Sequence, residues 1–139
     1  MPIRVLVMLG FTVFAGCTKP KAVWSPQPPV TRADGLVTQV LAAGSGDEAK
    51  RGDKITVHFV GTLSDGGVFD SSRARNAPFS FWVGERQVIE GLDDGLLGMR
   101  EGETRRITVP PELGYGSDEK PGIPPGSTLR FEVELLDVR

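Results

Sequence analysis

Aromatic side chains are the residues of this sequence with the clearest capacity for binding chemistry. The chain holds seven Phe, two Trp and one Tyr. Beyond residue 33 the aromatic residues are Phe59, Phe69, Phe79, Phe81, Trp82, Tyr115 and Phe131. A small core needs some of these rings for packing, whereas a surplus at strand ends and in loops can equally line an apolar cleft. Both roles stay open at this stage.

Groups suited to nucleophilic or metal chemistry are scarce. The sequence has one His, His58, and one Cys, Cys17, which excludes the usual zinc spacings and an intramolecular disulfide framework. His58 lies on the face of its strand opposite Phe59, and we expect it to make a structural hydrogen bond. We therefore expect neither a metal nor a cofactor.

Three further patterns indicate no site. Residues 44–49 match the G-x-G-x-x-A dinucleotide pattern, but no helical apolar run follows them, so we expect a turn. Asp93 and Asp94 are expected on the solvated face of a helix. Arg105 and Arg106 form too short a basic run to follow a phosphate backbone.

Length and composition bound the class of protein. The chain has 139 residues, of which 24% are charged, and a formal net charge of -2. This is the composition of one ordinary globular domain. Because there is no basic excess, we expect no nucleic-acid partner.

The first 16 residues follow the plan of a signal peptide. Arg4 is their only charged side chain, and an apolar run follows from Val5 to Ala15. This run is shorter than the roughly 20 apolar residues that a membrane-spanning helix needs. We therefore expect residues 1–16 to be cleaved.

The residues around Cys17 resemble the lipobox of bacterial lipoproteins, because Ala15 and Gly16 precede the only Cys. The resemblance implies that Cys17 becomes the acylated, palmitate-bearing first residue. The protein would then be anchored to a membrane of the bacterial cell envelope, expected to be the outer membrane on its periplasmic side. The alternative is a plain signal peptide followed by an incidental Cys.

Residues 17–32 are expected to form a tether between this anchor and the domain. Their prolines are Pro20, Pro26, Pro28 and Pro29. Proline at this density favours extended polyproline II geometry and prevents a helix.

Strand patterns dominate the domain, which we place at residues 33–139. Lys54–Leu63 and Leu129–Leu135 alternate apolar and polar side chains, as expected of half-buried antiparallel strands. Weaker strand patterns cover Leu36–Leu41, Phe79–Val83 and Glu103–Val109. Residues 65–67, Asp-Gly-Gly, predict a turn.

One helix is predicted from about Gln87 to Met99, from apolar residues at roughly helical spacing. Gly91, Gly95 and Gly98 each weaken it by up to about 1 kcal/mol, so packing must hold it in place. Strands beside a single short helix make an α+β domain.

Seven short motifs occur in order along this domain. They are VHFVG at 57–61, FDSS at 69–72, PFSF at 78–81, VIEG at 88–91, GYG at 114–116, PGIPP at 121–125 and FEVEL at 131–135. Together they strongly resemble the FKBP family of peptidyl-prolyl cis/trans isomerases. The resemblance implies an antiparallel β-sheet curled around one short α-helix, with an apolar pocket between them.

The same resemblance implies the site. Its catalytic positions correspond to Asp70, Phe69, Tyr115 and Phe131. Its substrate-binding positions correspond to Phe59, Phe79, Val88, Ile89, Leu92 and Ile123. Phe59 stands where many members have Tyr, and Leu92 stands where many have Trp at the pocket floor. The first change removes a hydroxyl near Asp70, and the second makes the floor smaller.

The implied reaction needs desolvation rather than a nucleophile. Rotation about an X-Pro bond crosses a barrier of about 20 kcal/mol. The twisted transition state loses amide resonance, and its carbonyl oxygen carries less charge than in the planar ground state. An apolar pocket that excludes water therefore penalises the ground state more. An acceleration of about 10^4 requires roughly 5.5 kcal/mol of such differential binding.

Four positions have roles that the sequence leaves to be tested. The backbone N–H of Ile89 and the hydroxyl of Tyr115 are expected to bind substrate carbonyls, although the Tyr115 hydroxyl would equally cap a turn. Asp70 either orients the twisted carbonyl or pairs with Arg75 to hold a loop. Ile123 is expected at the pocket rim, because its apolar side chain would otherwise be exposed.

Two functions follow from the resemblance. The first is an isomerase of X-Pro bonds in cell-envelope proteins, with unfolded or Pro-containing segments as partners and rapamycin-type macrolides as inhibitors. The alternative is a non-catalytic or weakly catalytic chaperone-like binding module. No long helical pattern precedes the domain, and we expect a monomer. Turnover of a Pro-containing peptide discriminates between the two functions.

Overall fold

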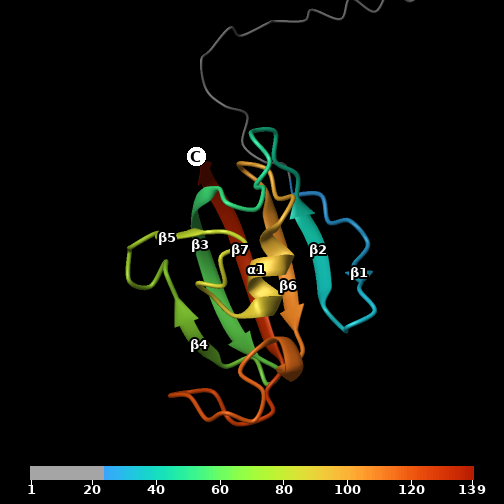
Figure 1. Ribbon diagram of the computed structural model, residues 1–139, viewed down its shortest axis with the longest axis vertical. Helices are drawn as coiled ribbons and strands as arrows, with labels where there is room; N and C mark the ends of the chain where they lie inside the picture. Colours follow the sequence, from blue (N-terminus) through green and yellow to red (C-terminus); the bar gives the residue numbers. More distant parts are fainter. Residues whose placement is uncertain (1–23) are drawn as a thin grey trace, which may run out of the picture.

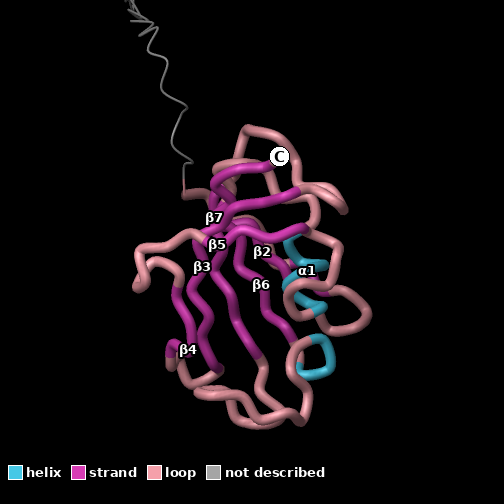
Figure 2. The backbone as a smooth tube through the Cα atoms, turned by 60° about the vertical axis from the view of Figure 1, so that its left-hand side comes forward, coloured by secondary structure: helices cyan, strands magenta, loops and turns pink. Residues whose placement is uncertain are grey.

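The computed structural model describes residues 24–139, so the expected signal peptide and Cys17 lie outside the described residues. Within that range the chain forms a seven-stranded sheet and one α-helix, α1 Glu90–Leu96. The strands are β1 Val30–Thr31, β2 Val37–Ala42, β3 Lys54–Leu63, β4 Val68–Ser71, β5 Phe79–Trp82, β6 Thr104–Val109 and β7 Leu129–Val138. Every pairing is antiparallel, and α1 lies against one face of the sheet (Figures 1 and 2). The predicted α+β class is confirmed.

The strand order is β1-β2-β6-β7-β3-β4, with β5 also paired to β3. Two short strands thus share one edge of β3: β5 pairs with its first part, and β4 pairs with its last part. The chain between β4 and β5 leaves the sheet at this point (Figure 1). This break in the edge is where the functional site lies.

The two long strands β3 and β7 each turn one face toward the core. On β3, Ile55 and Val57 are buried, and on β7 every second residue from Leu129 to Leu135 is buried. The predicted alternation on both strands is therefore confirmed. Because α1 covers the same face, the buried side chains are enclosed between helix and sheet.

Helix α1 is shorter than the predicted span of residues 87–99. Its N-terminal boundary is set by Ile89, which has extended backbone geometry, and at its other end Leu97 is again extended. Gly98 follows in the left-handed region with φ +83°. The apolar spacing that extended the prediction to Val88 comes from a loop whose side chains face the same core.

The glycines of α1 allow it to approach the sheet closely. A Cβ added to Gly91 would lie 2.5 Å from Val109 Cγ1, and one added to Gly95 would lie 2.7 Å from Ile107 Cγ2. Both contact side chains belong to β6. The glycines that weaken the isolated helix are thus required by its packing.

Asp93 corrects a prediction about the helix surface. Its exposed fraction is 0%, whereas a solvated position was expected. The side chain turns toward the loop before α1, where backbone N–H groups bind it. The expectation was wrong because an acidic pair on an amphipathic pattern does not show which carboxylate has backbone donors nearby.

The described part of the expected tether lies along the sheet edge. Ser25 N donates to Leu41 O at 2.9 Å, Gln27 N donates to Val40 O at 2.7 Å, and Val30 pairs with Thr38 of β2. Proline is compatible with an edge strand, where its missing N–H can face solvent. Neither β1 nor β4 was predicted, because β1 has two residues and the sequence VFDS of β4 does not alternate.

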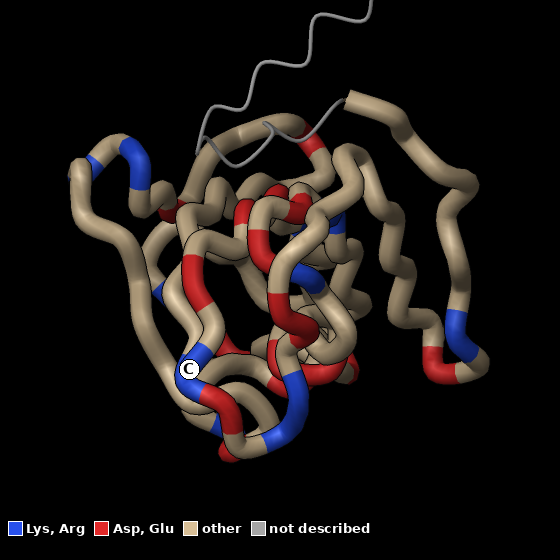
Figure 3. Tube along the Cα trace, turned by 90° about the horizontal axis from the view of Figure 1, so that it is seen from above, with Lys and Arg blue, Asp and Glu red and all other residues tan. Residues whose placement is uncertain are grey.

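Arg32 joins this edge to the helix. It pairs with Asp34 beside it and with Asp94 of α1, at 3.3 Å from Arg32 Nη2 to Asp94 Oδ2. Hydrogen bonding to Arg32 holds the pKa of Asp34 below its usual value, because the bond favours the ionised carboxylate. Acidic and basic positions are interspersed over the trace in Figure 3. No helix within residues 24–139 is long and apolar enough to cross a membrane.

Candidate functional site

An apolar cleft of about 270 Å³ opens between the sheet and the loop that precedes α1. Its residues are Val57, Phe59, Phe69, Asp70, Arg75, Phe79, Phe81, Gln87, Val88, Ile89, Leu92, Leu96, Tyr115, Phe131 and Val133. Nine of the ten implied site residues, all except Ile123, are therefore brought together. The rest of the lining comes mostly from residues on the inward faces of the same strands and helix.

Aromatic rings form the walls of this cleft. Phe131 contacts Phe69 edge to face at 5.6 Å between ring centroids, and it contacts Phe59 at 6.3 Å. Phe59 also contacts Phe79 at 6.1 Å. These rings come from β7, β4, β3 and β5, so four strands must be in register for the wall to form. The aromatic surplus noted in the sequence thus serves both packing and a cleft.

Gly61 sets the position of the Phe69 ring. It lies on β3 between its partners Asp70 on β4 and Phe131 on β7. A Cβ at this position would lie only 2.6 Å from Phe69 Cζ. The absence of a side chain at Gly61 therefore leaves room for the outer edge of the Phe69 ring beside β3, where the ring contacts Phe131.

The loop before α1 supplies the opposite wall. Val88 and Ile89 line the cleft from this loop, and Leu92, 8% exposed, follows from the first turn of α1. The Ile89 backbone N–H has no acceptor within residues 24–139. A free donor at the edge of an apolar cleft can bind the carbonyl of a bound peptide.

Tyr115 provides a second donor. Its ring lines the cleft, with the Lys120 Nζ 5.6 Å from the ring centroid. Its hydroxyl bonds no group in the described part of the chain, residues 24–139. Of the two roles left open by the sequence, capping of a turn within that part therefore receives no support.

Asp70 forms an ion pair with Arg75, and both residues line the cleft. Asp70 Oδ1 also accepts a hydrogen bond from the N–H of Ser71 at 2.9 Å. The pairing with Arg75 foreseen in the sequence is thus present. It fixes a carboxylate at the cleft wall.

Ile123 lies in an adjoining groove rather than in the main cleft. This groove shares Phe69, Asp70 and Tyr115 with the cleft and adds Lys120, Pro121 and Ile123. Ile123 is only 6% exposed, so the loop tip folds inward instead of standing free. Ile123 was expected at the rim of the cleft. It lies instead in the adjoining groove, beside the wall that the groove and the cleft share.

Two hydrogen bonds near the cleft hold neighbouring segments of the chain together. His58 Nδ1 lies 2.9 Å from Ser72 Oγ, which also accepts the Phe59 N–H at 2.8 Å, so the predicted structural hydrogen bond of His58 is confirmed. Sequence reasoning missed Ser72, which is fully buried.

Within residues 24–139 no group of three or more His, Cys, Asp or Glu side chains is placed to hold a metal ion.

Comparison with known proteins agrees with this arrangement. Residues 46–136 match the family model described as FKBP-type peptidyl-prolyl cis-trans isomerase. An FK506-binding protein of Neisseria meningitidis serogroup B is 50% identical over 105 residues, covering 75% of this chain and 96% of that protein. FK506-binding protein 2B of Rhizopus delemar is 43% identical over 141 residues, and the chain spans 65% of its length. The chain spans 24% of FK506-binding protein 4 of Neurospora crassa.

Solved structures show the same fold. The crystal structure of FkpA from Escherichia coli superposes with a TM-score of 0.74 at 46% identity, over 80% of this chain and 51% of that one. The crystal structure of AtFKBP13 gives a TM-score of 0.74 at 35% identity, over 81% of this chain and 100% of that one. With the family model matched across most of the sheet and α1, this chain belongs to the FKBP-type peptidyl-prolyl cis-trans isomerase family.

Proposed function

We propose that this protein catalyses cis/trans isomerisation of X-Pro peptide bonds held in the aromatic cleft. The observation that carries the proposal is an apolar cleft with two donors at its edge, the Ile89 N–H and the Tyr115 hydroxyl, that have no partner among the described residues 24–139. An apolar enclosure accepts the prolyl ring, and the donors bind the flanking carbonyls of the peptide.

The walls supply the differential binding. Phe69, Phe131 and Tyr115 exclude water from the prolyl amide, which destabilises the polar planar form relative to the twisted one. Asp70, held by Arg75, places a carboxylate at the same wall. The carbonyl oxygen loses negative charge as the bond twists, so repulsion from this carboxylate also falls at the transition state.

The proposed substrates are extended or unfolded segments with an apolar residue before proline, because most side chains that line the cleft are aromatic or aliphatic. The relatives named FK506-binding proteins support the further proposal that a rapamycin-type macrolide occupies the same cleft. We propose that the protein acts as a monomer.

We further propose that the substrates are proteins of the bacterial cell envelope. This rests on the signal-peptide pattern of residues 1–16 and the lipobox-like junction at Cys17. Acyl chains on Cys17 would hold the domain beside the outer membrane, where exported chains fold.

The proposed activity is tested with the purified full chain and a set of Pro-containing peptides that differ in the residue before proline. The expected result is faster isomerisation than in buffer, greatest for apolar residues and abolished by a rapamycin-type macrolide. A rate equal to that of buffer for every peptide would disprove catalysis. Peptide binding without turnover would instead favour the non-catalytic binding module.

A further inference from the structure

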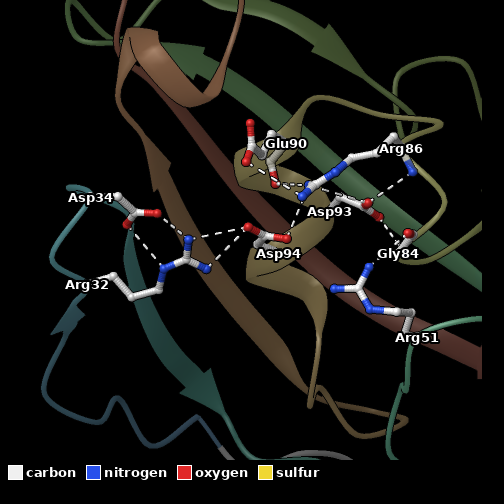
Figure 4. A network of polar contacts seen from close by, with 8 residues as sticks. All are labelled: Arg32, Asp34, Arg51, Gly84, Arg86, Glu90, Asp93 and Asp94. Atoms are coloured by element: carbon white, nitrogen blue, oxygen red, sulfur yellow. Dashed lines mark hydrogen bonds and ion pairs between the residues drawn. The ribbon is translucent and has the colours of Figure 1, made fainter.

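Asp93 is a fully buried carboxylate that does not line the cleft. Its two oxygens bind the loop before α1: Oδ1 accepts the Gly84 N–H at 2.7 Å, and Oδ2 accepts the Arg86 N–H at 3.2 Å. Figure 4 shows this side chain directed toward Gly84 and Arg86, while the neighbouring Asp94 is directed toward Arg32. A buried carboxylate is costly unless such donors satisfy it, so this arrangement is specific.

The backbone of Asp93 binds the other end of the same loop. Its N–H donates to Ile89 O at 3.0 Å as the first turn of α1 begins. One residue thus holds three points of the loop from Gly84 to Ile89. That loop carries Val88 and Ile89, which line the cleft, and it carries the Ile89 N–H that is proposed to bind substrate.

The loop has a conformation that needs such support. Arg86 has φ +57°, in the left-handed region that disfavours residues with a Cβ. Its side chain folds back onto α1, with Nη1 3.2 Å from Asp94 Oδ1. Gly84 is held from its other side, because Arg51 Nη1 donates to Gly84 O at 3.0 Å. The carboxylate of Asp93 is the contact that joins these backbone groups to the helix.

We propose that Asp93 is a positioning residue for the isomerisation: its carboxylate holds the Gly84–Ile89 loop so that the Ile89 N–H and the Val88 side chain face the bound X-Pro segment. This inference rests on the proposed function. Asp93 does not line the cleft, yet through the loop it influences both substrate affinity and turnover.

The test compares Asp93→Asn with Asp94→Asn in the full chain. An amide of nearly the same shape offers one acceptor oxygen, so one of the two loop N–H groups loses its partner and the loop shifts. We expect kcat/KM for an X-Pro peptide, per folded molecule, to fall about tenfold, the scale of a small displacement in a preorganised site. The affinity for a rapamycin-type macrolide should fall in parallel.

Two controls separate positioning from mere stability. Asp94→Asn removes ion pairs to Arg32 and Arg86 but no backbone bond, and it should keep kcat/KM within about twofold of the wild-type value. Leu36→Ala removes a buried side chain that does not line the cleft. It should lower the melting temperature while leaving kcat/KM per folded molecule unchanged.

A measurement on the wild-type chain covers the case in which Asp93→Asn does not fold. The amide protons of Gly84 and Arg86 should exchange slowly with solvent. The Glu85 amide, which has no acceptor within residues 24–139, should exchange fast. Equally fast exchange at all three amides would overturn the proposal.

Normal kcat/KM and normal macrolide affinity in a folded Asp93→Asn variant would also overturn it. If the wild-type chain shows no turnover, the proposed function fails. In that case macrolide affinity and amide exchange still decide whether Asp93 holds the binding loop.

Discussion

The Tyr115 hydroxyl, which bonds no group in the described part of the chain, is the clearest single-residue feature of the cleft. Tyr115→Phe removes one proposed hydrogen bond to substrate, and a bond of this kind contributes about 0.5–1.5 kcal/mol. We expect kcat/KM to fall by up to about tenfold. The melting temperature should stay unchanged, because the hydroxyl bonds no group within residues 24–139. A clear loss of thermal stability without a change in turnover would restore the turn-capping role.

The side chain of Phe131 belongs to both the core and the cleft. It is 4% exposed and contacts both Phe59 and Phe69. Phe131→Ala should lower the free energy of unfolding by about 3–5 kcal/mol and also lower turnover per folded molecule. Chemical denaturation and peptide turnover measure the two effects.

Leu135→Ala on the same face of β7 is the matched control, because Leu135 is buried but does not line the cleft. It should lower stability by about 2–5 kcal/mol and leave turnover per folded molecule intact. If Phe131→Ala left both quantities unchanged, the assignment of Phe131 to the cleft would be wrong.

At the scale of elements, Gly91 and Gly95 determine how closely α1 packs against β6. Gly95→Ala adds up to about 1 kcal/mol of helix propensity. It also forces a Cβ to within 2.7 Å of Ile107 Cγ2. Overpacking of this kind costs about 1–3 kcal/mol, so we expect net destabilisation.

Thermal melts of Gly95→Ala and of Glu90→Ala, a substitution on the exposed side of α1, check this expectation. The Glu90 variant should stay within about 0.5 kcal/mol of the wild-type stability. A Gly95 variant more stable than the wild type would show that the helix can move away from β6 without strain.

The same elements show what the sequence predicts well. Lys54–Leu63 was predicted with its observed bounds, because a long strand with one buried face leaves a clear alternation. The helix was predicted too long, since Val88 faces the core from an extended loop and mimics helical spacing. Strand β1 was missed because two residues carry no pattern, and β4 was missed because its sequence VFDS has two apolar residues followed by two polar ones instead of an alternation.

Some site residues were predicted from the sequence and others were missed, for a related reason. Motifs around Phe69, Tyr115 and Phe131 carried the family resemblance, and the structure places all three in one cleft. Asp93 and Ser72 were given no such role, although Ser72 ends the FDSS motif, because their importance lies in backbone groups that approach them from other segments. The closeness of Gly61 to Phe69 likewise depends on strand register, which cannot be read directly from the sequence.

At the scale of the whole molecule, the segment before β2 connects the proposed anchor to the domain. Residues 25–31 are bonded along β2, so the described chain begins at the edge of the sheet. None of the residues 25–31 lines the cleft, whose walls come from other elements. Anchoring at Cys17 is therefore compatible with an open site.

Cys17→Ser tests that anchoring. Each buried CH₂ of an acyl chain contributes about 0.8 kcal/mol to membrane binding. Expressed in a bacterial host, the wild-type chain should fractionate with membranes, and the Cys17→Ser variant should move to the soluble fraction with its isomerase activity intact. Equal distribution of the two chains would contradict lipidation at Cys17.

The central claim is tested most directly by exchange NMR of a Pro-containing peptide at equilibrium, with and without a small amount of the full chain. A catalyst that binds the twisted bond speeds cis/trans exchange without changing the cis-to-trans ratio. The account predicts faster exchange at an unchanged ratio, and loss of the effect when a rapamycin-type macrolide fills the cleft. Exchange at the rate of the free peptide, under conditions where the peptide demonstrably binds, would contradict it.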